Sequence, residues 1–156
     1  MKVTTVALFS LLILSLSCTT NLDKSNQKGM KLRVELFTTD MEKSVNFYTN
    51  VLDFKMEGTA INHSYQPVKK GNVTLGIGPL SKLSEDHHFN PKDGTIQKGY
   101  GVEIVLEVDN VTEVYEQVKS SGYPIHGPLK TQPWGLTDFR LVDPDGYYLR
   151  ITSKNR

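Results

Sequence analysis

Cysteine and histidine, which bind transition metals and act as nucleophiles, are few in this sequence. The chain has one cysteine, Cys18, and four histidines. His87 and His88 are adjacent, and adjacent side chains on an extended segment point to opposite sides, so this pair alone forms no chelate. We expect both to lie in a solvated loop. His63 and His126 stand far apart in the sequence, so the histidines by themselves predict no metal site.

The elements that would position a site follow from hydrophobic periodicity. Residues 32–36 alternate apolar and charged side chains, which predicts a strand with one face in a core. Asp40 is a good helix N-cap, and apolar residues at positions 41, 45, 48 and 52 predict a helix of about three turns after it. Strand-like runs follow at residues 54–58, 64–68 and 73–77, with a turn at residues 70–72.

The second half of the chain repeats this order. After a polar connector the pattern predicts a strand, a helix closed by Gly122 and three more strands, at residues 102–108, 111–121, 123–127, 139–142 and 147–152. A shift of 70 residues superposes Leu36 on Leu106 and Asp40 on Asn110. Repetition at this period indicates two duplicated modules rather than a solenoid.

Two motifs resemble a known family. Residues 33–54, in which Asp40 opens a helix containing Phe47-Tyr48, are similar to the first module of the vicinal oxygen chelate superfamily, which includes glyoxalase I, bleomycin-resistance proteins and extradiol dioxygenases. Asp143-Pro144-Asp145-Gly146 and the residues to Ile151 resemble its closing turn and strand. The resemblance implies an α+β fold of two βαβββ modules, whose curved mixed sheets form a cleft with flanking helices. The Asp-Pro-Asp-Gly segment is a tight hairpin whatever the function.

Metal-dependent members of that superfamily place one His, Gln or Glu on the first and last strand of each module. The corresponding positions here are Arg33, Leu75 or Gly76, Glu103 and Arg150. Only Glu103 could coordinate a metal, because arginine has no lone pair and two such cations repel a dication. Glu35, on the same strand face as Arg33, could serve as a displaced ligand but leaves too few donors. We therefore predict no metal and no cofactor.

The arginines suggest a different site. We expect Arg33 and Arg150 to flank Glu103, with Glu35 and Glu107 on the same faces. A guanidinium offers a planar fork for carboxylate or phosphate, so the cluster could orient an anionic or strongly polar ligand. Alternatively, the groups pair internally and hold the two modules in register.

Aromatic residues could supply a wall for such a ligand. Trp134, between Pro133 and Gly135, is expected near the mouth of the cleft, either as a stacking platform for a flat ligand or as a lid on the core. Tyr148 shares the face of Arg150 if the strand alternates. Tyr65 and His63 are weaker candidates for the same wall.

The start of the chain indicates export. A basic start and an apolar run from Val6 to Leu16 are typical of a signal peptide, and Cys18 directly afterwards resembles a bacterial lipobox cysteine. We therefore expect a lipoprotein-type signal peptide (1–17), a flexible tether (18–29) and the domain (30–154), in which module one is 30–79, the connector 80–99 and module two 100–154. The location would be the bacterial cell envelope, lipid-anchored and extracytoplasmic. Simple secretion and a cytoplasmic protein are the alternatives.

The balance of basic and acidic residues limits the classes of partner that the protein could bind. The chain has 18 basic and 17 acidic residues, and removal of residues 1–17 deletes Lys2 and no acid, which leaves 17 of each. A balanced chain without a basic stripe argues against nucleic acid as a partner. Membrane association would come from the lipid alone, and the resemblance implies either one cleft within a chain or modules exchanged in a homodimer.

Three function classes remain open. The sequence favours a metal-independent small-molecule binder of the bleomycin-resistance type. The first alternative is an enzyme, a lyase or isomerase of the glyoxalase type, with Glu103 or Glu35 as general base. The second is an envelope interaction protein without a working pocket, since a fold does not determine a function.

Overall fold

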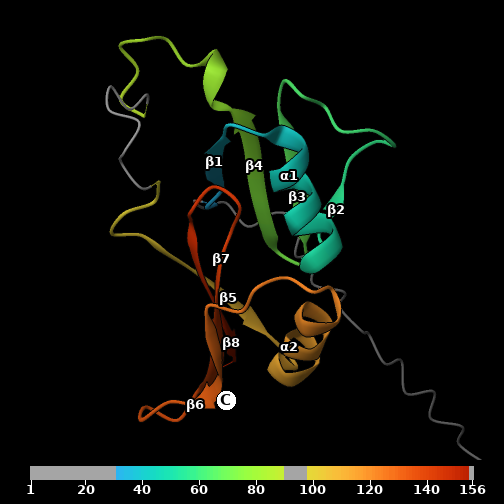
Figure 1. Cartoon of the computed structure of the whole chain (residues 1–156), viewed down its shortest axis with the longest axis vertical. Helices are drawn as coiled ribbons and strands as arrows, with labels where there is room; N and C mark the ends of the chain where they lie inside the picture. Colours follow the sequence, from blue (N-terminus) through green and yellow to red (C-terminus); the bar gives the residue numbers. More distant parts are fainter. Residues whose placement is uncertain (1–30, 90–97, 155–156) are drawn as a thin grey trace, which may run out of the picture. The chain divides into compact units, whose positions relative to one another are not determined.

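The first module is a strand, a helix and three further strands. The structure, a computed structural model, describes residues 31–89 and 98–154 (Figure 1). The elements of this module are β1 (Val34–Thr38), α1 (Met41–Asn46), a π-helical turn η2 (Phe47–Val51), β2 (Lys55–Met56), β3 (Gln66–Lys70) and β4 (Val73–Pro79). They form a mixed sheet of order β1-β4-β3-β2, in which β1 and β4 are parallel. A 3₁₀ turn, η3 (Leu80–Lys82), follows.

The second module has the same topology. Its elements are β5 (Glu103–Val108), α2 (Val111–Ser120), β6 (Gly127–Thr131), β7 (Thr137–Val142) and β8 (Tyr148–Ser153). The sheet order is β5-β8-β7-β6, with β5 and β8 parallel. The predicted repeat of two βαβββ modules is therefore confirmed.

Both helices begin at the predicted residues. The side chain of Asp40 accepts a hydrogen bond of 3.0 Å from the Lys43 amide, and that of Asn110 accepts one of 3.2 Å from the Glu113 amide. These caps satisfy amides that have no partner within the helix. The helix of about three turns predicted after Asp40 is present over residues 41–51, but only its first part is α-helical (α1), and the rest is the π-helical turn η2.

One predicted strand lies elsewhere. The segment 123–127 was expected to be a strand, but β6 begins at Gly127. Pro124 has no amide to donate to a sheet. Tyr123 instead packs its ring against Phe47 of the first module, with centroids 4.6 Å apart, and its hydroxyl donates to the carbonyl of Val142. This segment joins the modules rather than extending a sheet.

Each sheet has one buried and one open face. Along β5, Ile104 and Leu106 belong to the core, whereas Glu103, Val105 and Glu107 are exposed. The helix α2 packs on β7 and β8, so the open face lies opposite it. The same alternation along β1 buries Leu36 and Thr38 and leaves Glu35 on the other face.

Candidate ligand-binding site

A pocket of about 530 Å³ lies along the edges of the two sheets. We call it the seam pocket, because β1 and β5 are the edge strands of different modules and both line it. The connector between the modules completes the wall. Its lining residues are Val34, Glu35, Leu36, Phe37, Leu80, His88, Phe89, Lys98, Gly99, Tyr100, Val102, Ile104 and Tyr147. Most of these side chains are apolar or aromatic, which is typical of small-molecule sites.

An aromatic group forms one wall of the seam pocket. The ring of Phe37 lies 5.5 Å from that of Phe89 and 6.2 Å from that of His87, measured between centroids. His88 contacts Phe89 edge to face at 5.4 Å. These tilted and edge-on arrangements are the ones that aromatic quadrupoles favour. His87 and His88 lie in a loop, as expected, with His87 half-buried and His88 exposed, and both rings contact this wall.

The end of the connector is held by Tyr147. Its hydroxyl accepts a hydrogen bond of 3.3 Å from the amide of Phe37, at the free edge of β1. Gly99 lies against the Tyr147 ring, and a Cβ atom at Gly99 would be 2.6 Å from the ring. Gly99 also has a φ of 68°, so glycine is required there both by backbone conformation and by space.

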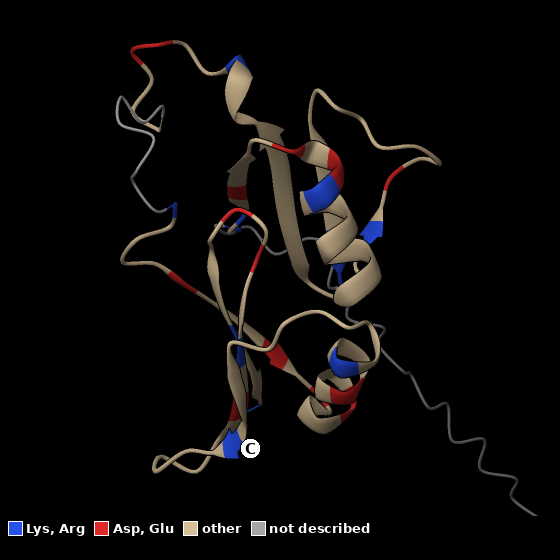
Figure 2. Cartoon of the chain, viewed as in Figure 1, with Lys and Arg blue, Asp and Glu red and all other residues tan. Residues whose placement is uncertain are grey.

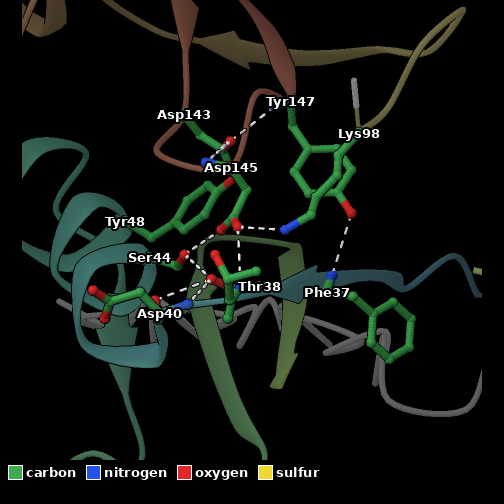
Figure 3. A network of polar contacts seen from close by, with 10 residues as sticks. Phe37, Thr38, Asp40, Ser44, Tyr48, Lys98, Asp143, Asp145 and Tyr147 are labelled. Carbon is green, nitrogen blue, oxygen red and sulfur yellow. Dashed lines mark hydrogen bonds and ion pairs between the residues drawn. The ribbon is translucent and has the colours of Figure 1, made fainter. Parts of the chain in front are cut away.

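The neighbouring Lys98 belongs to a polar network that joins the modules (Figure 3). Its Nζ lies 2.8 Å from Oδ1 of Asp145. The hydroxyl of Ser44 in α1 donates to Oδ2 of this carboxylate, and the amide of Thr39 donates to Oδ1 at 3.3 Å. Burial alone would raise the pKa of Asp145, but the hydrogen bonds from Lys98 and Ser44 hold that pKa below its ordinary value.

A second carboxylate of the same turn behaves in the opposite way. Asp143 accepts hydrogen bonds from the Tyr48 hydroxyl at 2.8 Å and from the amides of Asp145 and Tyr147. Burial raises the pKa of Asp143, and these hydrogen bonds offset only part of that effect. The Asp-Pro-Asp-Gly turn is therefore more than the local hairpin expected from the sequence, because both of its carboxylates bind the first module.

Glu35 is the acidic residue of the seam pocket. Its Oε1 lies 2.5 Å from Nε of Arg33 and accepts a hydrogen bond of 3.0 Å from the Tyr65 hydroxyl. Across the sheet, Glu35 is in register with Gly76. A Cβ atom at Gly76 would lie 2.1 Å from the Glu35 carboxylate and 2.2 Å from the Tyr65 hydroxyl, so these two groups fill the space above the glycine.

Glu103 and Arg150 lie on the open face of the other sheet. Glu103 contacts Arg150 and also Arg140, with Oε to Nε distances of 3.4 Å to each. The predicted grouping of Arg33 with Glu103 and Arg150 is therefore corrected. Arg33 pairs with Glu35 on the first sheet, and Arg140 takes its place beside Glu103. The physical reason is that β7 pairs directly with β8, whereas β1 belongs to another sheet.

Two other predicted residues lie outside the seam pocket. Trp134 stands in the turn between β6 and β7, where Gly135 adopts a φ of 89°, and its side chain is exposed. Tyr148 is half-buried on β8, with its ring 5.4 Å from that of His126. Neither lines the pocket.

The sequence reasoning missed several lining residues. Phe37 follows Glu35 at the spacing of one strand face, which is a usable signal. The run His87-His88-Phe89 is a weaker one, and Lys98, Gly99 and Tyr147 have no local signal for a pocket.

Known proteins resemble this chain over most of the domain. The family description that matches residues 32–151 is the Glyoxalase/Bleomycin resistance protein/Dioxygenase superfamily. The chain belongs to this superfamily. Lactoylglutathione lyase of Salmonella typhimurium is 31% identical over 127 residues, which cover 77% of this chain and 89% of that protein. Bleomycin resistance protein of Klebsiella pneumoniae is 48% identical over 54 residues, or 30% of this chain and 42% of that one.

Solved structures agree on the fold. TioX from Micromonospora sp. ML1 matches with a TM-score of 0.63 and 21% identity, covering 80% of this chain and 98% of its own. Identity at this level supports the shared fold, which here consists of two four-stranded mixed sheets with few helices.

The metal that the superfamily implies does not fit the residues present. Leu75 is in the core, so the second ligand position falls on Gly76, which has no donor and whose space is filled. Arg33 and Arg150 have no lone pair. Figure 2 shows β4 without a charged residue, and this strand, Val73–Pro79, contains no His, Gln or Glu. Within residues 31–89 and 98–154, no group of three His, Cys, Asp or Glu side chains could hold a metal ion.

The expected signal peptide, Cys18 and the tether lie outside the described residues. In the described part of the chain, no helix is long and apolar enough to cross a membrane.

Proposed function

We propose that this protein binds a small organic molecule in the seam pocket without a metal ion. The observation that carries the proposal is the pocket of about 530 Å³ itself. The positions that would hold the superfamily's metal lie outside its lining, and three of the four carry no donor for a divalent cation. A cavity of this size falls within the range that holds small ligands. The 48% identity of a 54-residue segment to a bleomycin resistance protein supports a binding role for the same fold.

The residues that line the seam pocket indicate the chemistry of its ligand. The aromatic wall of Phe37 and Phe89 favours a flat apolar body. Glu35 and Lys98 add one charge of each sign, so polar groups on the ligand would be oriented by them. Trp134 and Tyr148, proposed from the sequence as further ligand contacts, would require a ligand that extends beyond this pocket.

The test combines metal analysis with a panel of small molecules. The purified protein is assayed for zinc, nickel, iron and manganese and then screened by thermal shift against a panel of aromatic and polar compounds. We expect less than stoichiometric metal and several compounds that raise the melting temperature. Stoichiometric metal would contradict the proposal, and a panel without any stabilising compound would favour the envelope interaction protein.

A matched pair of variants locates the site. Phe89→Ala removes a pocket side chain that is 55% exposed, and Trp134→Ala removes a similarly exposed one, 58%, outside the pocket. Binding should weaken at least tenfold in Phe89→Ala and persist in Trp134→Ala. The reverse result, or a change in Trp134 fluorescence on binding, would support the sequence-based stacking platform instead.

A glyoxalase-type lyase is the second candidate. It is supported by the 31% identity to lactoylglutathione lyase over most of the chain. Glu35 would act as the general base, because it lines the pocket and is oriented by Arg33 and Tyr65. Turnover of the hemithioacetal of methylglyoxal and glutathione, lost in Glu35→Gln, would establish this function in place of simple binding.

Oligomeric state and location complete the proposal. We propose a homodimer, since Val102 and Val105 are exposed at and beside the edge strand β5. Light scattering measures the mass directly. We also propose a lipid anchor at Cys18, which palmitate labelling of wild type and Cys18→Ala would test.

A further inference from the structure

Arg140 and Arg150 are direct neighbours across the antiparallel pair of β7 and β8. Both alternate with core residues along their strands, so they share the open face of the second sheet. Like charges directly opposite each other destabilise a sheet, and these side chains are only 16% and 24% exposed. The pair therefore requires negative charge close by.

The chain supplies this charge incompletely. Glu103 is shared between the two arginines at 3.4 Å, longer than the roughly 2.8 Å of a charge-assisted hydrogen bond. Oδ1 of Asp138 lies 2.7 Å from Nη1 of Arg140 and also accepts a hydrogen bond from Gln132, whereas its buried Oδ2 has no hydrogen-bond partner in the described part of the chain. Among the described residues, the buried Nη1 of Arg140 and Nε of Arg150 donate no hydrogen bond. The two guanidinium groups thus have more donors than these partners satisfy.

The position of Glu103, Arg140 and Arg150 in the fold indicates what the unsatisfied donors could bind. Glu103 and Arg150 occupy two of the positions at which metal-dependent relatives are expected to hold their ligands. Both guanidinium groups are permanently charged; that of Arg150 stands at one of these positions, and that of Arg140 lies directly across from it on β7. We propose that Arg140 and Arg150 together bind an oxyanion of a ligand, with Glu103 as an internal counter-ion that the oxyanion displaces.

Exchange of the counter-ion is consistent with burial. The Glu103 side chain is 35% exposed, so its carboxylate can turn to water when a ligand arrives. Asp138 is buried and keeps its contact with Arg140, which holds that guanidinium in place. A planar carboxylate or a phosphate can accept two parallel hydrogen bonds from an arginine fork. No member of the cluster lines the seam pocket, so the inference stands independently of the function proposed above.

The test follows the arginine side chains by NMR. The ¹⁵N-labelled protein is titrated with sodium acetate or inorganic phosphate, with sodium chloride holding the ionic strength constant. We expect saturable shifts of the Nε–H resonances of Arg140 and Arg150. Saturation with acetate assigns a carboxylate ligand and saturation with phosphate a phosphate group. Equal shifts in chloride alone would overturn the proposal.

Three variants sharpen the result. Arg150→Gln should abolish saturation at Arg140, while its fold is retained because Arg140 still pairs with Asp138 and Glu103. Glu103→Gln should tighten binding about fivefold, equivalent to about 1 kcal/mol, because the competing counter-ion is gone. Lys119→Gln, a charge removal on α2 away from the open face, should leave the dissociation constant unchanged. Weaker binding in Glu103→Gln would show that this carboxylate supports the ligand, against the proposal.

Discussion

The hydroxyl of Tyr48 donates a hydrogen bond of 2.8 Å to the carboxylate of Asp143, which lies 95 residues further along the chain. One residue comes from the helical Phe-Tyr motif of the first module and the other from the Asp-Pro-Asp-Gly turn of the second. The two motifs that most resemble the superfamily are therefore in direct contact, and this contact joins the modules.

Tyr48→Phe should destabilise the protein by about 2 kcal/mol. The variant keeps the buried ring but leaves the Asp143 carboxylate without one of its donors, and a hydrogen bond to a charged group contributes about that much. Urea denaturation of both proteins measures the difference. Tyr115→Phe is the control, because in the described structure the Tyr115 ring contacts Phe139 and its hydroxyl has no hydrogen bond. Equal losses in the two variants would contradict the role of the contact.

Asp145→Asn should lower stability by about 3 kcal/mol at pH 7, since it leaves Lys98 without its buried partner. The folded pKa of Asp145 is lowered, so its contribution is present above the unfolded pKa and is lost as the pH falls through the folded one. The difference in the free energy of unfolding between this variant and wild type should therefore become smaller below about pH 4.

For Asp143→Asn we expect the opposite pH dependence of stability. The folded pKa of Asp143 is raised, so protonation of the wild type favours the folded state. The free energy of unfolding of wild type should therefore rise relative to that of the variant as the pH falls through the same range. Denaturation at several pH values distinguishes the two carboxylates, and parallel changes in both variants would contradict these assignments.

Gly99→Ala should be more destabilising than Gly101→Ala. Both glycines have positive φ values, 68° and 79°, so each substitution carries a backbone cost of about 1 kcal/mol. Only at Gly99 would the new Cβ meet the Tyr147 ring, which adds about 1–3 kcal/mol of overpacking. Thermal denaturation of the two variants isolates the ring contact, and ligand binding in the seam pocket should weaken only in Gly99→Ala.

Asp53→Gly should stabilise the protein by about 0.5 kcal/mol. Asp53 has a φ of 57°, a conformation that is unfavourable for residues with a side chain and that glycine adopts freely. The lost contacts with Lys55 and Lys70 are exposed and contribute little. Asp53→Asn removes the charge but keeps a side chain, so its melting temperature should stay close to that of wild type. A melting temperature below wild type in Asp53→Gly would show that the ion pair matters more than the backbone.

Much of the fold follows from local sequence patterns. The alternation at residues 32–36, the caps at Asp40 and Asn110 and the tight turn after Asp143 each depend on residues within a few positions of each other. Such features survive in any tertiary arrangement, and the repeat of the same order in both halves predicted the two modules. The strand expected at residues 123–127 is absent because Pro124 has no amide to donate to a sheet, and Tyr123 packs against Phe47 instead.

Part of the candidate site could likewise be predicted from the sequence, and part could not. Alternation placed Glu35, Glu103 and Arg150 on open strand faces, and the residue types alone showed that a metal set is missing. Pairing across strands needed the tertiary structure. It put Arg140 beside Glu103, left Arg33 with Glu35 and brought the connector over the edge of β1.

The sequence by itself thus determined the modules, their caps and turns, and the lack of a metal donor at three of the four expected positions, because each rests on short-range geometry or on the chemistry of one side chain. Only the tertiary structure decided which charges meet and where the pocket lies. Strand alternation defines the face on which a side chain stands, but its neighbours on that face come from strands far away in the chain.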